Sequence, residues 1–589
     1  MKANNIFRTK NILFLLTTLI FTGCTKLDEK VYDEVLGNNA SSPAGALAAA
    51  YDRLGDGTFV DHGAVFALQE YTTDEAILAT RGSDWGDGGK WRSMHEFTWA
   101  SDNPIVTDNW NMLTNGITRA LTAIREITNS SETQKTLLLA EAKGLLAYYT
   151  FTTLDLFGQA PYRDPLIDKP PLEVKQAATG IDELILQVEA LIPDLATLGA
   201  QSTHNGRFTK EAAYALLTNM YLNRAVLKDR YATSFNFNEK AVNSNDTDMD
   251  KVIYYSSLLI NSNKFQLTSN YFDSFSINNS KGSELIFVVV QKIDYIRNGS
   301  NSFGYVGVER NQKPSPANRG TNAACISPEF YASWEGNHDD PRFSRKYQYG
   351  DGTWFMNDAE GSVPGSDIVP NSPNNLPWFH FNRGIMVGQQ YGPRLNAAGG
   401  FEKTAEGRIK VFELVMEKST GTKMNFTPEL NFSNPSQAVF AQNEINRGAR
   451  CFKYEFDPEE GNGSSNVDIP LARLGAIYTM RAEAYFRKGQ NGLALDDINK
   501  LRTSRTRESL YGNAPGVAIA SLNEATLYKE IAFETYWELY RRPQMIRFGK
   551  FEQPFSAKPT TQPFRRIFPI PQSTMDVSKA FDQNQGYPK

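Results

Sequence analysis

Paired helical periods are the feature that most restricts the folds open to this chain. Behind the helix-start signal Asp102-Asn103-Pro104, an apolar residue recurs every three or four positions along one face. The members of this face are Val106, Trp110, Leu113, Ile117, Leu121 and Ile124. A second helical segment, residues 136–158, is stopped by Gly158 and Pro161. Its apolar stripe comprises Leu138, Ala142, Leu145 and Tyr149. We expect these two segments to be antiparallel partners.

Two further helix pairs follow the same pattern. One joins an amphipathic segment, residues 181–192, to an alanine-rich segment that begins at Thr209. The other spans residues 469–505, where an alanine- and aromatic-rich helix, a turn at Gly489 and a helix opening with Ala494 resemble the tetratricopeptide helix hairpin. Because one pair cannot bury its own apolar face, the pairs are expected to stack. The sequence therefore predicts a mainly α fold on a tetratricopeptide-like scaffold.

Residues 261–468 separate the second pair from the third and have few helical periods. They are rich in Asn, Gly, Pro and aromatic residues, and only residues 284–291 and 408–414 have the pattern of strands. Long stretches of this kind inside one body are usually functional loops on a rigid scaffold, so we expect a large loop-rich ligand-binding portion here. The predicted organisation is a signal peptide (1–23), an N-terminal helical region with an early ligand loop (24–240), and a C-terminal region with the loop-rich insertion followed by the tetratricopeptide-like helices (241–589).

The N-terminus has the pattern of an export signal. Lys2, Arg8 and Lys10 precede an apolar run, residues 12–21, that has about half the roughly 20 residues needed to span a membrane. Small residues directly before Cys24 indicate a lipoprotein signal, in which Cys24 is acylated and becomes the mature N-terminus. The acyl chains would then hold the protein to its membrane. The alternative is an ordinary signal sequence with a chance cysteine.

Charge and cysteine content exclude several classes of function. Cleavage would remove three basic residues and leave 58 basic against 66 acidic residues, so the net charge would move from −5 to −8. Such a surface repels phosphate backbones, and nucleic acid is not an expected partner. Cys325 and Cys451 are too few for a disulfide framework, although export would permit one bond. No CxxC or HExxH occurs, and the sequence leaves open whether Asp- and Asn-rich loops bind a structural calcium ion; no other cofactor is expected.

The stretch ATRGSDWGDGGKWRSMHEFTWA places three tryptophans where neither a strand nor a helix period accounts for them. Sugar rings stack their C–H faces on Trp and Tyr, while Asp, Asn and Arg bind the hydroxyl groups. Residues 81–99 have this composition, as do residues 321–334 and 378–394. Trp99 and Trp110, beside a helix start, are expected in the core.

Five segments, in order, resemble the SusD/RagB family of outer-membrane nutrient-binding lipoproteins. They are AEAKGLLAYYTFTTLDLFGQAPYRDP, RFTKEAAYALLTNMYLN, IPLARLGAIYTMRAEAYFRKG, IAFETYWELYRRPQMIRFGKF and RRIFPIPQSTMDVSKAFDQNQGY. The resemblance covers nearly the whole mature chain. Two motifs depart from the family: Tyr540-Arg541-Arg542-Pro543 lacks the usual glycine and aspartate, and Gln585 stands where proline is usual. Both departures lie in segments that we assign to the scaffold.

The resemblance implies a function as well as a fold. Family members bind oligosaccharide or polysaccharide without catalysis and act as a lid on a SusC-like TonB-dependent outer-membrane transporter. Acidic residues just behind Cys24 resemble the signal that sends such lipoproteins to the cell surface. We therefore expect a lipid-anchored outer-membrane protein that faces the cell exterior.

The resemblance also suggests where a ligand binds, because in this family the loop before the first long helix often forms part of the sugar platform. Trp85 or Trp91 would then stack on a sugar, and the polar residues of the loop would bind its hydroxyl groups. The alternative is that Arg81 and the aspartates pair with each other to order the loop. The candidate residues of this loop are Asp74, Arg81, Trp85, Asp87 and Trp91. The middle loops add Cys325, Trp334, Arg383, Tyr391 and Arg394.

Two other functions stay open on sequence grounds. The tetratricopeptide-like groove would suit a protein–protein scaffold without a small ligand. A secreted glycoside hydrolase needs only two suitably spaced carboxylates, and their spacing is a property of the fold. Against catalysis, the chain contains no GxSxG, Walker or GxGxxG motif, and His338-Asp339-Asp340 before Pro341 has the pattern of a polar turn.

Overall fold

The computed structural model describes most of the chain beyond residue 41, and Pro43–Lys589 form one compact unit. The described residues are 42–198, 206–277, 279–292, 301–312, 319–345, 347–348, 354–355, 363, 365–369, 383–455, 465–508 and 513–588. Cys24 and the predicted signal peptide lie outside them. In this described part, no helix combines the length and the apolar character that crossing a membrane requires. The predicted boundary at residue 240 stays a prediction.

Helices α5 (Pro104–Thr128) and α6 (Lys135–Phe157) confirm the first predicted pair. The Asn103 side chain caps α5 by accepting a hydrogen bond from the Ile105 N–H at 2.9 Å, and Gly158 ends α6 in the left-handed conformation with φ 70°. A Cβ atom on Gly116 would lie 2.6 Å from the Tyr149 ring, so glycine at this position lets the two helices approach closely.

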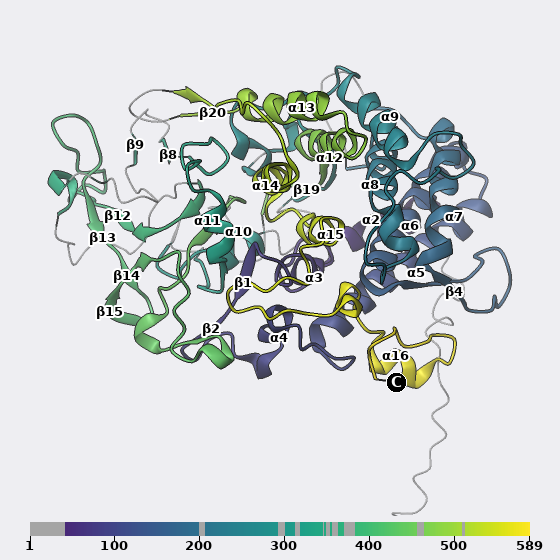
Figure 1. Cartoon of the computed structure of the whole chain (residues 1–589), viewed down its shortest axis with the longest axis horizontal. Coiled ribbons are helices and arrows are strands. Elements are labelled where there is room, and N and C mark those ends of the chain that lie inside the picture. Colours follow the sequence, from purple (N-terminus) through teal and green to yellow (C-terminus); the bar gives the residue numbers. More distant parts are fainter. Residues whose placement is uncertain are drawn as a thin grey trace, which may run out of the picture. The chain divides into compact units, whose positions relative to one another are not determined.

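The remaining long helices pack in a continuous series, as the hairpin pattern predicts. Contacts join α7 to α8, α8 to α9, α9 to α12 and α12 to α13, and in Figure 1 these helices lie together on one side of the picture. The mainly α fold is therefore confirmed. The bounds are α2 (Pro43–Gly55), α3 (Val65–Glu70), α4 (Arg92–Glu96), α7 (Ala177–Leu191), α8 (Lys210–Lys228), α9 (Asp248–Ile260), α12 (Leu474–Arg487), α13 (Asn491–Ser504), α14 (Glu524–Thr535), α15 (Arg541–Arg547) and α16 (Gln572–Val577).

One segment differs from the sequence expectation. Residues expected to begin the third helix pair form strand β19 (Ile469–Arg473) instead, which is buried throughout and pairs antiparallel with β5 (Leu285–Val289). Pro470 has no N–H group to donate inside a helix. The apolar residues of this segment pair with strand β5 instead. The helix consequently begins only at Leu474.

The loop-rich portion contains short helices and short strands, and most of its sheets have two strands. Two of its strands pair with strands from the N-terminal part of the chain. β1 (Ala76–Leu78) pairs antiparallel with β6 (Ala324–Ile326), and β2 (Thr80–Arg81) pairs parallel with β17 (Val439–Phe440). The other elements of this portion are α10 (Asn301–Gly307), α11 (Pro328–Ser333), β7 (Ser344–Arg345) and β18 (Arg450–Phe452) flanking β10 (Arg383–Met386), β8 (Tyr347–Gln348) with β9 (Trp354–Phe355), β11 (Gly388–Gln389) with β16 (Asn425–Phe426), β12 (Tyr391–Pro393) with β13 (Val411–Glu413), and β14 (Val415–Met416) with β15 (Ser419–Lys423). Two more strand pairs lie outside it, β3 (Gln159–Tyr162) with β4 (Glu173–Gln176) and β20 (Thr506–Arg507) with β21 (Ala514–Pro515). The predicted strands at residues 284–291 and 408–414 are thus confirmed as β5 and β13.

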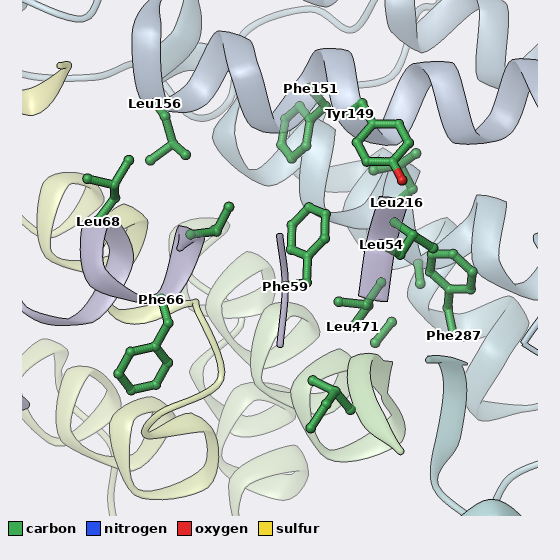
Figure 2. Close-up of a cluster of buried hydrophobic side chains, with 14 of the residues drawn as sticks. Leu54, Phe59, Phe66, Leu68, Tyr149, Phe151, Leu156, Leu216, Phe287 and Leu471 are labelled. Carbon is green, nitrogen blue, oxygen red and sulfur yellow. The ribbon is translucent and has the colours of Figure 1, made fainter. Parts of the chain in front are cut away.

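A large apolar core joins the helices to the strands. Figure 2 shows Phe59 among side chains from several elements, with Phe151 and Tyr149 of α6 on one side and Leu471 of β19 on another. Trp99 and Trp110 are buried in the same core, as expected. Cys325 and Cys451 are buried free thiols, so the one disulfide that export would permit is absent.

A set of fully buried charges, here called the buried ion cluster, locks the loop-rich portion to the C-terminal helices. Its members are Glu284, Arg473, Arg505, Glu534 and Glu538. Arg473 contacts Glu538 at 2.6 Å, Glu534 at 2.7 Å and Glu284 at 3.2 Å. Burial alone would raise the pKa of Glu284, but the guanidinium groups of Arg505 and Arg473 hold that pKa at about 2.

The predicted polar turn at His338-Asp339-Asp340 borders this cluster. The buried Asp340 carboxylate pairs with Arg342 at 2.8 Å, and Arg342 also contacts Glu530 of α14 at 2.8 Å. Although burial opposes it, the charge of Arg342 keeps the pKa of Asp340 low. Asp340 is thus ion-paired inside the protein, whereas the Asp339 side chain is exposed.

Candidate ligand-binding site

The loop between α3 and α5 is anchored at its base by Asp74. The Asp74 carboxylate accepts two hydrogen bonds of 2.6 Å from Arg541 and one of 3.2 Å from the Tyr528 hydroxyl. Burial would raise its pKa, but the Arg541 guanidinium lowers it. Asp74 thus ties the loop to α14 and α15, and its part in ligand binding stays a prediction. Arg541 belongs to the motif that departs from the family pattern.

Arg81 is also a structural residue. It is 2% exposed, and its guanidinium donates to the main-chain carbonyls of Ala323 at 3.1 Å, Ile445 at 3.0 Å and Arg447 at 2.7 Å. Neither of the two expectations for Arg81 holds, because it faces no solvent and its guanidinium donates to carbonyls and not to aspartates. Its contacts join the loop to the residue before β6 and to the segment that follows β17.

Trp85 is the tryptophan of this loop that keeps part of its surface exposed. Its backbone has φ 62°, a left-handed conformation that is costly for a bulky residue and that persists only where the surroundings enforce it. The turn before it is closed by two main-chain hydrogen bonds of 2.9 Å between Arg81 and Asp84. The Trp85 indole N–H donates to the Thr321 carbonyl at 3.2 Å. The ring is therefore held in one orientation while half-buried.

Two buried aromatic rings, those of His62 and Trp91, pack against the Trp85 ring. His62 lies edge-to-face with Trp85 at a centroid distance of 5.5 Å and stacks on Trp91 at 5.2 Å. Trp91 is 6% exposed, and its indole N–H donates to the Asp87 carboxylate at 2.7 Å. Burial lowers the pKa of His62, so this ring is neutral near pH 7. Trp91 is thus a supporting ring, which corrects its predicted stacking on a sugar, and the exposed Asp87 orients it.

Ion pairs link Asp84, the residue before Trp85, to a set of charged side chains here called the charge rim. Asp84, the neighbour of Trp85, pairs with Arg310 at 3.3 Å and with Lys418. Glu417 pairs with Arg319 at 3.0 Å and with Arg310 at 3.6 Å, which links the two ends of the set. The Arg319 and Lys418 side chains are 44% and 39% exposed. The rim comprises Asp84, Arg310, Arg319, Glu417 and Lys418.

Most of the residues predicted from the middle loops belong to the interior. Trp334 is fully buried and stacks on Phe533 with 3.5 Å between ring centroids, and the buried Cys325 thiol lies against the Ile77 carbonyl. Arg383 is buried and donates to Ser276 and to main-chain carbonyls. Their burial corrects these three predictions.

Two residues of that prediction lie on the β12–β13 hairpin. Tyr391 is nearly buried within the strand pair, and Arg394 keeps partial exposure while it contacts Glu402 at 3.4 Å. The part of these two residues in ligand binding stays a prediction. Trp378, from the same predicted segment, lies outside the described residues.

The charge rim and Thr321 escaped the sequence reasoning for a physical reason. Lys418 and Glu417 sit in the turn of the β14–β15 hairpin, where charged residues are ordinary, and they reach Asp84 only through the fold. The one signal in the sequence that pointed to Thr321 was the composition of the segment that begins with it, residues 321–334.

The site combines a fixed, half-exposed aromatic ring with neighbouring hydrogen-bond donors and acceptors. Comparison with known proteins then decides the family. The sequence model of the SusD family matches residues 234–587, and a second model, described as starch-binding and associating with the outer membrane, matches residues 48–222. The chain belongs to the SusD family. The resemblance seen in the five sequence segments is thereby confirmed.

Individual SusD-family proteins are similar along almost the whole chain. Starch-binding protein SusD from Bacteroides thetaiotaomicron is 24% identical over 552 residues, which cover 89% of this chain and 85% of that protein. A laminarin-binding SusD-like protein has a similar structure, with a TM-score of 0.61 at 16% identity, over 92% of this chain and 99% of that one. Surface glycan-binding protein A from Bacteroides thetaiotaomicron, solved with laminarihexaose, gives 0.60 at 16% identity over 92% and 98%. These structures share the SusD fold.

Proposed function

We propose that this chain binds oligosaccharide or polysaccharide and that the exposed surface of Trp85 is its stacking platform. The observation that carries the proposal is the enforced left-handed backbone of Trp85, whose ring is held between the Thr321 carbonyl and the His62–Trp91 layer. Pyranose C–H faces stack on such a ring, and the charge rim offers donors and acceptors to hydroxyl groups. The names of the starch-binding and laminarin-binding relatives support a glycan as the ligand.

We propose further that the protein acts at the outer membrane without catalysis. Acylated Cys24 would anchor it, facing the cell exterior, and a SusC-like TonB-dependent transporter would receive the captured glycan. The sequence around Cys24 and the description of the matched N-terminal model support this location. Both carboxylates of the charge rim are paired with Arg or Lys, whereas a glycosidase needs one of its two carboxyl groups protonated as an acid.

A glycan panel tests the proposal on the soluble chain without its signal peptide. We expect a soluble oligosaccharide to bind, no reducing ends to be released, and Trp85→Ala to weaken binding by about 1 to 3 kcal/mol, the usual scale for a buried aromatic contact. Calorimetric titration measures this loss. Tyr254→Ala, which removes an exposed aromatic ring on α9, is the matched control and is expected to leave the affinity unchanged. Equal affinities for Trp85→Ala and the unmodified chain would refute the platform.

A further inference from the structure

A buried carboxylate lies behind the charge rim and joins two segments of the loop-rich portion. Glu309 is 1% exposed. One of its carboxylate oxygens accepts the Asn311 N–H at 2.6 Å, and the other accepts the Glu417 N–H at 3.1 Å. The segment around Glu309 and the turn of the β14–β15 hairpin are thus held together by the two oxygens of one side chain. The Asn311 amide adds a hydrogen bond of 2.9 Å to the Val415 carbonyl.

The same two segments carry the cations that pair with Asp84. Arg310 lies next to Glu309 in sequence and contacts Asp84 at 3.3 Å. Lys418 lies next to Glu417 in the turn of the β14–β15 hairpin and contacts the Asp84 carboxylate as well. The distance between these two cations, and therefore the position of Asp84 between them, depends on how closely Glu309 holds the segments.

The segment that leads into Glu309 also supports the Trp85 ring. The Thr321 N–H donates to the Tyr305 carbonyl at 3.0 Å, and the Asn322 N–H donates to the Val308 carbonyl at 2.8 Å. The Thr321 carbonyl accepts the Trp85 indole N–H. The aromatic platform and the charge rim consequently meet at one short piece of chain, residues 305–312.

We propose that Glu309 is a positioning residue of the glycan site: its carboxylate sets the spacing of the charge rim beside Trp85 and thereby the affinity for glycan. The proposal rests on the proposed function of Trp85. Because Glu309 is buried, it acts through Arg310 and the hairpin turn and not by touching the ligand.

The charge state of Glu309 gives this arrangement a pH dependence. Burial raises the pKa of Glu309 to about 7, the main-chain N–H groups of Asn311 and Glu417 oppose that rise, and the negative charge of Glu417 adds to it. The Arg310 main-chain N–H also opposes the rise, and the charge that faces Glu309 from β18 is Arg450. The ionised carboxylate accepts N–H groups at both oxygens. Protonation places a hydroxyl donor opposite one of these N–H groups. The contact that Glu309 makes between the two segments therefore weakens as the pH falls through 7.

The experiment compares Glu309→Gln with Asp468→Asn, using maltoheptaose and laminarihexaose as probes. Asp468 is the matched control because it is equally buried and accepts the Gln291 N–H at 2.7 Å next to β19, outside the Trp85 site. At pH 8 we expect Glu309→Gln to weaken binding about tenfold, the scale of one lost charged hydrogen bond, while Asp468→Asn keeps the wild-type affinity. Between pH 8 and pH 6 the wild-type affinity is expected to fall and that of Glu309→Gln to stay level.

Hydrogen exchange supplies a measurement that needs no ligand. Glu309→Gln is expected to speed exchange at residues 309–312 and at 415–419 together, and Asp468→Asn to leave both segments unchanged. Wild-type affinity and a wild-type pH profile in Glu309→Gln, or unchanged exchange at residues 415–419, would overturn the proposal. If no sugar of the glycan panel binds the wild-type chain, the proposed function fails, while the exchange result still decides the role of Glu309.

Discussion

The buried ion cluster and the charge rim pair the same residue types in opposite surroundings. In the cluster, Arg473 contacts three carboxylates and all of these groups are shielded from solvent. In the rim, Arg319 pairs with Glu417 and remains 44% exposed. Desolvation makes the first arrangement costly to break, whereas solvent screens the second. The cluster therefore fixes the framework, and the rim keeps side chains that can exchange protein partners for ligand hydroxyl groups.

The largest expected effect comes from breaking the buried ion cluster. Arg473→Met is expected to lower the free energy of unfolding by about 3 to 5 kcal/mol, because it leaves buried carboxylates without their shared partner. Denaturant unfolding followed by tryptophan fluorescence measures this loss. A loss below about 1 kcal/mol, the value typical of exposed pairs, would remove the distinction between the two sets of charges.

Acid is expected to act on the same cluster. The folded-state pKa of Glu284 is about 2 against 4.5 for an unperturbed Glu, so its ionised form stabilises the fold above pH 4.5 and that stability is lost as the pH falls toward 2. The full contribution is about 3 kcal/mol. The difference in unfolding free energy between wild type and Glu284→Gln should therefore shrink from pH 6 to pH 3. A constant difference over that range would contradict the assigned pKa.

The smallest expected effect concerns the rim. Arg319→Met is expected to change the free energy of unfolding by less than about 1 kcal/mol, because its pair with Glu417 is exposed and screened. Salt should reduce even this difference. Unfolding curves at low and high salt check the result, and a loss as large as that of Arg473→Met would show that the rim is part of the framework.

Local signals predicted the helical framework well. Asn103 and Pro104 start α5, and Gly158 ends α6, because capping depends on a few neighbouring residues. The burial of Trp99 followed from its place beside that helix start.

The site was predicted only in part, because its contacts are distant in sequence. Arg81 donates to carbonyls more than 240 positions away, and Trp334 is covered by Phe533. No composition rule reveals such partners. Trp85 could be chosen as a candidate, but the left-handed backbone that makes it a platform, and the rim beside it, required the fold.

A crystal structure with the oligosaccharide that binds most tightly in the glycan panel tests the central claim most directly. The account predicts a sugar ring on the exposed face of Trp85, with ring carbons within about 4 Å of the indole and hydroxyl groups hydrogen-bonded to the charge rim. A sugar bound elsewhere, with the Trp85 face bare, would contradict the account.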